Sequence, residues 1–194
     1  EIAKIPKPNL NREIVITEKS IVESDKAQVI SIIKETIAEV NKAPLSFDTW
    51  TRLGTQFKII GDYESAEEIW VYVTKANPYN VAAFFNLGNL YHQYLKDYPK
   101  SESAFRSVLK NDPKYVSAYL ALSDLYRYSY QKETTKAVDV LKEGLVKNTN
   151  EFDLLTNLAS LYEENGNLAE AKNYYTKALS VAKSKNDNKS IGLL

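Results

Sequence analysis

The sequence predicts an all-α fold, a right-handed α-solenoid of four helix pairs with an N-terminal capping helix. Two observations indicate it: an eight-residue pattern returns four times at a near-constant spacing, and a second helical pattern follows each copy. Of the 194 residues, 44% are hydrophobic and 26% are charged, which is ordinary composition for a chain that buries a core. Each helix pair is therefore expected to bury one face against the next pair.

The repeated pattern places a bulky residue, a leucine, a small residue and an aromatic residue on one stripe of a helix. Its copies are Trp50-x-x-Leu53-Gly54-x-x-Phe57, Phe84-x-x-Leu87-Gly88-x-x-Tyr91, Tyr119-x-x-Leu122-Ser123-x-x-Tyr126 and Leu155-x-x-Leu158-Ala159-x-x-Tyr162. The leucines are 34, 35 and 36 residues apart. A fixed period of this length is the signature of a repeat architecture, and the small residue lets a neighbouring helix approach closely.

A small residue and, four positions later, a large one follow each copy and lie on one face of a second helix. These pairs are Ala66 and Trp70, Ser101 and Phe105, Ala137 and Leu141, and Ala171 and Tyr175. Pro78 and Pro113 close the first two units, because proline cannot continue a helix. The repeats are therefore predicted within 46–185, at 47–80, 81–115, 116–151 and 152–185.

These residues resemble the tetratricopeptide repeat family, whose 34-residue pattern is W-x2-L-G-x2-Y, then A-x3-F, then a proline. The resemblance covers about 47–183; the first copy is nearest to the pattern, and the last two have lost the glycine and the proline. It implies that the first helices of the repeats line a concave groove that holds a protein or peptide. The chain is accordingly expected to be an interaction scaffold and not an enzyme.

The segments that flank the repeats are predicted to cover the ends of the array. Residues 1–23 contain Ile5-Pro6-Lys7-Pro8, which favours extended chain, so they are expected to form a linker or an arm lying along the array. Residues 24–43 are predicted to be a capping helix that starts at Ser24-Asp25. Its isoleucine stripe either covers the first repeat or pairs with a second copy of the chain. Residues 186–194 are expected to be a C-terminal tail, which leaves the last helix without a polar cover.

Copies two and three carry extra residues between their two helices. These are expected in the turn inside each repeat, at Leu95–Asp97 and Ser129–Glu133. The longer turns are either a secondary contact surface or neutral variation in a loop.

The resemblance also implies which side chains face the groove. They are Thr51, Arg52 and Thr55 in the first copy, Phe85, Asn86, Asn89 and His92 in the second, Leu120, Asp124, Arg127 and Tyr128 in the third, and Asn157 and Ser160 in the last. The groove is expected to begin basic at Arg52 and Lys58, to pass an amide and aromatic centre, and to end acidic at Glu163 and Glu164. The alternative is a solvated helix face with unselected charges.

Several functional classes are disfavoured by residue types that are missing. One tetratricopeptide subtype clamps a terminal carboxylate with lysine, arginine and asparagine, but the matching positions hold Thr51, Thr55, Asn86, Ser117 and Ala121, so the chain is not expected to be a carboxylate-clamp co-chaperone. With one histidine, His92, and no cysteine, no catalytic residue, metal site or cofactor is expected. Equal numbers of basic and acidic residues, 25 each, disfavour nucleic acid as a partner.

A narrower resemblance concerns location. The lead-in Pro6-Lys7-Pro8-Asn9 and the segment Gly61-Asp62-Tyr63-Glu64 resemble bacterial tetratricopeptide proteins that carry an N-terminal membrane anchor. This implies the extracytoplasmic face of a bacterial membrane, with the cytoplasm as the alternative, and membrane contact only through a segment absent from this chain. A monomer or weak homo-oligomer is expected. The competing functions are a self-assembly module and an accessory domain of a larger protein.

Overall fold

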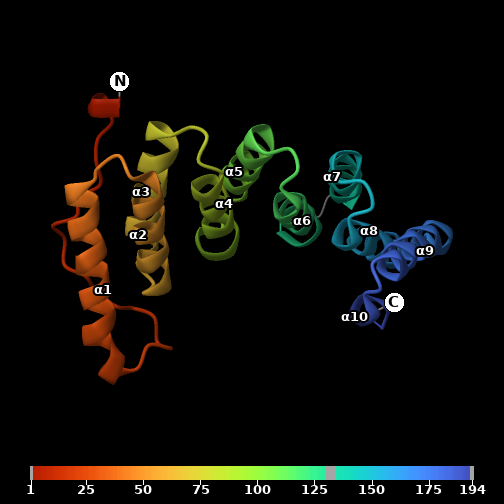
Figure 1. The fold of residues 1–194 in the computed structure, drawn as a ribbon, viewed down its shortest axis with the longest axis horizontal. Helices are drawn as coiled ribbons and strands as arrows, with labels where there is room; N and C mark the ends of the chain where they lie inside the picture. The colour runs from red at the N-terminus through yellow and green to blue at the C-terminus, as the bar shows by residue number, and fades with distance from the viewer. Residues whose placement is uncertain (1, 130–133, 193–194) are drawn as a thin grey trace. The chain divides into compact units, whose positions relative to one another are not determined.

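The computed structural model describes residues 2–129 and 134–192, and it contains helices and no strand within those ranges (Figure 1). The predicted all-α class is therefore confirmed.

The chain divides into two compact units, Glu1–Ala104 and Phe105–Leu194. Each is a short solenoid of helix pairs. The helices of the first unit are η1 (Ile2–Lys4), α1 (Glu23–Lys42), α2 (Phe47–Ile59), α3 (Tyr63–Ala76), α4 (Val81–Leu90), η2 (Tyr91–Leu95) and the start of α5 (Tyr98–Asn111). The second unit holds the rest of α5 with α6 (Val116–Asp124), η3 (Leu125–Ser129), α7 (Thr134–Lys147), α8 (Phe152–Glu164), α9 (Leu168–Ser184) and α10 (Asn188–Ile191).

The first helix pair, α2 and α3, packs through the small and large residues of the repeat pattern. Trp70 is fully buried, and a Cβ atom built on Gly54 would lie 2.5 Å from its indole nitrogen. That nitrogen donates a hydrogen bond to the backbone oxygen of Thr51 at 3.0 Å. The glycine of the repeat is therefore the place where the second helix presses its tryptophan onto the first.

The bulky residue that starts the pattern also anchors the preceding turn. The Trp50 indole donates to the carbonyl oxygen of Pro44 at 3.0 Å, and the Tyr119 hydroxyl donates to that of Pro113 at 2.9 Å. Both rings are buried. Because a buried N–H or O–H needs an acceptor, these bonds fix the turn before α2 and the turn before α6.

The predicted capping helix is α1, and it packs on α2 in the first unit. Ile33 and Val40 of its apolar stripe are buried. The helix begins at Glu23 rather than Ser24, and its N-cap Val22 makes no side-chain hydrogen bond. Glu23 and Asp25 in the first turn instead place negative charge near the positive end of the helix dipole.

The first helices of the second and third repeats each end in a π-helical turn, η2 and η3. These are the two repeats with extra residues, whereas α2 and α8 of the other two repeats lead directly into their turns. A π turn accommodates one additional residue inside a helix. The prediction that the extra residues lie in the turn is therefore wrong at Leu95, which belongs to η2, and at Ser129, which belongs to η3. Of the predicted Ser129–Glu133 insertion, residues 130–133 lie outside the described residues.

The far end of the second unit consists of α8 and α9, and the segment predicted to be a C-terminal tail, 186–194, contains α10. Asp187 caps α10, accepting bonds from the Ser190 backbone N–H at 3.1 Å and from its hydroxyl at 2.6 Å. An open pocket of about 450 Å³ remains beside α9, lined in part by Leu168, Tyr175 and Ile191.

Candidate partner-binding surfaces

The candidate groove residues on α2 are largely engaged within the chain. Thr51 is 8% exposed and donates its hydroxyl to the Phe47 carbonyl oxygen at 2.8 Å. It also accepts a hydrogen bond of 3.5 Å from Asn80, which caps α4. The Thr55 hydroxyl donates to the Thr51 carbonyl oxygen at 3.1 Å. Thr51 therefore offers little surface to a partner and supports the junction between the first two repeats.

Arg52, the predicted basic start of the groove, forms an ion pair with Glu39 of α1. Both side chains are about half exposed, at 52% and 56%. Lys58 lies 5.9 Å from the centre of the Tyr94 ring, a cation–π contact. The charges at this end therefore have partners inside the first unit.

The α4 face carries the amide groups. Asn89 donates its side-chain nitrogen to the Phe85 carbonyl oxygen at 3.0 Å, which leaves its own oxygen as an acceptor. Asn86 lies one turn away and is half-buried, and its side chain makes no hydrogen bond with the part of the chain that the structure describes. His92 follows in η2, with its ring centre 6.2 Å from that of Tyr98 in an edge-on contact. Asn86 is therefore the group on this face best able to bond a partner.

In the second unit, the π turn η3 carries Arg127 toward α8. Its guanidinium pairs with Glu164, with a hydrogen bond of 2.9 Å from Nε, and donates to the Ser160 hydroxyl at 3.4 Å. Its carbon Cζ lies 4.7 Å from the centre of the Tyr128 ring, and 10% of the Arg127 side chain is exposed. The predicted groove residues Arg127, Tyr128 and Ser160 thus form one cluster with Glu164.

Leu120 and Asp124 lie on α6, the first half-buried and the second exposed. On α8, Asn157 donates its side-chain nitrogen to the Asp153 carbonyl oxygen at 2.8 Å. The other predicted acidic residue, Glu163, accepts a hydrogen bond of 3.0 Å from the Tyr175 hydroxyl. Burial and the bond to Glu163 raise the pKa of Tyr175 above its usual value.

The predicted change from a basic to an acidic groove is therefore weaker than the sequence suggested. Arg52 and Glu164 are each paired inside their own unit, and Glu163 accepts the tyrosine bond. Spacing along one helix could not reveal this, because the partners come from other helices. What remains on these faces is mainly amide and aromatic surface, including Tyr128 at 60% exposure.

Sequence reasoning missed an aromatic contact at the repeat edge in the first unit. Tyr63, at the start of α3, lies with its ring centre 4.5 Å from that of Tyr94 in η2. Tyr94 is 40% exposed. Ile59, which follows Lys58 at the end of α2, is 54% exposed. The extra residue of the second repeat, which produces η2, was the signal that the helix end is reshaped here.

The described residues contain neither a metal-binding cluster of side chains nor a membrane-spanning helix. Within residues 2–129 and 134–192, no group of three histidine, aspartate or glutamate side chains is placed to hold a metal ion. No helix in those ranges is both long enough and apolar enough to cross a membrane.

Comparison with known proteins identifies the repeat. Tetratricopeptide repeat models match residues 60–114 and 152–185. Among solved structures, the chain is similar to MamA, with 20% identity over 84% of this chain and 94% of that chain and a TM-score of 0.67. It is also similar to PilF of Pseudomonas aeruginosa, with 16% identity, 87% and 82% coverage and a TM-score of 0.62.

A third similar structure is YrrB, described as a TPR protein with an unusual peptide-binding site, with 12% identity, 87% and 84% coverage and a TM-score of 0.59. No curated protein matches the sequence significantly. At these identities the solved structures show the fold alone, and the repeat models agree with it at the level of sequence. Residues 60–114 and 152–185 are therefore tetratricopeptide repeats, and the fold of the chain is that of tetratricopeptide repeat proteins.

Proposed function

We propose that this protein is an interaction scaffold that holds an extended peptide against the first-helix faces of its repeats. Repeats of this family support protein or peptide partners, and the similar protein YrrB is described as having a peptide-binding site. The observation that carries the proposal is Asn86, a half-buried amide on α4 with no hydrogen-bond partner among the described residues.

A peptide backbone suits this amide. An asparagine side chain offers one acceptor and two donor hydrogens, which match the carbonyl and N–H of an extended chain. Asn89, one turn away, adds a free acceptor oxygen, and Phe85 beside them provides apolar surface. Compact interfaces concentrate their energy in such aromatic groups ringed by polar ones.

The internal pairing of Arg52 and of Glu164 changes the kind of peptide expected. Partner recognition should depend on hydrogen bonds to the asparagine side chains and on apolar contacts more than on the order of charges along the peptide. Binding is then expected to fall only slightly when salt is raised, because ionic contacts are the ones that salt screens.

The test is selection from a random peptide library followed by affinity measurement. Phe85→Ala with Asn86→Ala should weaken the selected peptide at least about tenfold, since a lost hot-spot contact costs more than about 1 kcal/mol. Tyr79→Ala is the matched control, an aromatic that is 81% exposed on the turn before α4. Unchanged affinity in the double variant would reject the α4 face as the binding surface.

A second candidate is a self-assembly module, favoured by the open pocket beside α9 with Leu168 66% exposed at its edge. Sedimentation at increasing concentration separates the candidates. If a Leu168→Ser variant loses association, the self-assembly function is supported. If the wild-type chain is a strict monomer at all concentrations, that function is ruled out.

A further inference from the structure

The N-terminal arm lies in a groove of the first unit. Residues 5–18, here called the strap, contact α3 on one side and face the C-terminal end of α1 on the other. Pro8 is buried, and four strap residues pack partly buried against the core. These four are Ile5, Leu10, Ile14 and Ile16. The alternation of Ile14 and Ile16 thus directs two side chains inward without forming a strand.

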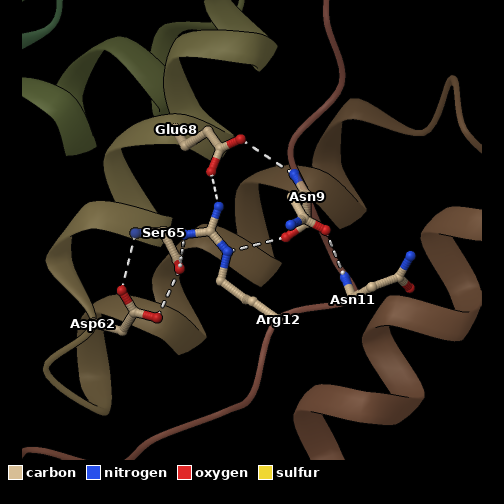
Figure 2. Close-up of polar contacts among 6 residues, drawn as sticks. All are labelled: Asn9, Asn11, Arg12, Asp62, Ser65 and Glu68. Carbon is tan, nitrogen blue, oxygen red and sulfur yellow. Dashed lines mark hydrogen bonds and ion pairs between the residues drawn. The ribbon is translucent and has the colours of Figure 1, made fainter.

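One carboxylate of α3 holds the middle of the strap (Figure 2). Glu68 accepts a hydrogen bond from the Asn9 backbone N–H at 3.2 Å and pairs with the Arg12 guanidinium. Arg12 also donates to the Ser65 hydroxyl oxygen at 3.0 Å and, through Nε, to the Asn9 carbonyl oxygen at 3.1 Å. Glu68 therefore recognises two features together, a backbone N–H and an arginine three residues later.

The end of the strap is held at the turn between α2 and α3. The backbone N–H groups of Thr17 and Glu18 both donate to the Ile60 carbonyl oxygen, at 2.9 and 3.0 Å. Gly61 follows with φ of +84°, and a Cβ atom there would lie 2.2 Å from the Thr17 hydroxyl oxygen. Glycine is thus required both for the turn and for the seat of Thr17.

Between Pro6 and Ile16 the strap is held by side-chain contacts and by the hydrogen bond from the Asn9 backbone N–H to Glu68. From Pro6 to Ile16, no backbone group of the described strap bonds to the backbone of a helix. A cavity of about 220 Å³ remains between Lys7–Asn11 and the side formed by Val40, Asn41 and Trp50. A segment with few backbone bonds and an incompletely filled interface is at the low-stability end of a fold.

We propose that the groove between α1 and α3 is a second binding site, separate from the first-helix faces, and that the strap is its resident ligand. The external ligand is an extended peptide with the same Asn-x-x-Arg pattern followed by two alternating apolar residues. Such a peptide presents to Glu68 the N–H and guanidinium that the strap now presents, and it binds when the strap is displaced.

The experiment uses the full chain and a labelled peptide that copies residues 6–18. A tethered ligand acts at millimolar effective concentration, so the strap excludes micromolar peptide from the wild-type chain. Arg12→Ala in the chain should release the strap and raise peptide affinity at least about tenfold. Hydrogen exchange at the Thr17 and Glu18 amides of that variant reports the release directly.

Two variants test recognition by Glu68. Adding Glu68→Gln to the Arg12→Ala chain should abolish peptide binding, whereas Glu67→Gln should leave it unchanged, because Glu67 bonds Tyr91 instead. A peptide that carries Arg12→Ala should not bind. The proposal is overturned if the peptide binds wild-type and Arg12→Ala chains equally, if it binds neither, or if the Thr17 and Glu18 amides stay protected in the variant.

Discussion

The first and last repeats share one turn but differ in what covers it. Gly61 and Gly166 both precede the second helix with positive φ, +84° and +75°. A Cβ atom at Gly61 would meet Thr17 of the strap, whereas at Gly166 it would meet no atom within 4 Å. The same contrast holds in the helices, since Trp70 is fully buried and its counterpart Tyr175 is half-buried beside an open pocket. The contribution of a residue at a given repeat position to stability therefore depends on which residues pack against it.

The largest expected effect on stability comes from replacing the two equivalent aromatic residues, Trp70 and Tyr175. Trp70→Ala should destabilise the chain by about 4 kcal/mol, because it opens a large cavity and leaves the Thr51 carbonyl without its indole donor. Tyr175→Ala should cost about 1–2 kcal/mol, since part of that ring is already in solvent. Urea denaturation followed by circular dichroism measures both, and equal losses would break the comparison.

The turn glycines give the next effect. Gly166→Ala should cost about 1 kcal/mol, the usual penalty for a side chain at positive φ. Gly61→Ala adds the clash with Thr17, so about 2 kcal/mol or more is expected there. Thermal unfolding of the two variants provides the readout. If Gly166→Ala were the more damaging change, the strap would not be seated as described.

For the ion pairs, the larger loss of stability is expected in the second unit and the smaller one in the first. Arg127 is 10% exposed and joins η3 to α8, whereas Arg52 and its partner are about half exposed. Arg127→Ala should cost about 1–2 kcal/mol through its lost charge-assisted bonds and ring contact. Arg52→Ala should cost under about 0.5 kcal/mol, as exposed pairs do. A double-mutant cycle with Glu164→Gln would measure the Arg127 pair, and a coupling near zero would contradict its assigned role.

The smallest effect is at alkaline pH. Burial raises the pKa of Tyr72 above its usual value of about 10, so the folded state keeps a proton that the unfolded state releases. Stability is then lost as pH rises past about 10. Tyr72→Phe should lose less stability than wild type between about pH 9 and about pH 11, seen as a smaller fall in Tm. Tyr175→Phe should show the same direction. A steeper fall in Tyr72→Phe would mean that the hydroxyl is not buried as described.

The repeat frame was predictable because it depends on local spacing. Gly54 and Trp70 occupy adjacent helices at positions that the period alone specifies, and their close contact follows from small and large residues on facing stripes. The capping helix was predictable in the same way from its apolar stripe. Its first residue was not, because charge in the first turn replaced the expected cap at Ser24.

The candidate surface was only partly predictable, because its chemistry depends on contacts between distant residues. Position in the repeat placed Arg52 and Arg127 on first helices, but nothing local indicated that Glu39 and Glu164 pair with them. The docking of Arg12 on Glu68 joins residues 56 apart, with no periodic signal in the arm. The extra residues of the second and third repeats were visible in the sequence, but it was not predicted that they form π turns at the ends of the first helices.

The central claim is that a partner binds on the first-helix faces, with Asn86 at the surface that carries recognition. The most direct measurement is amide chemical-shift mapping of the chain with a library-selected peptide bound. We predict that the largest shifts lie on α4 around Asn86 and Asn89, with others on α2 of the same unit. Shifts confined to the second helices, with the α4 amides unchanged, would contradict the account.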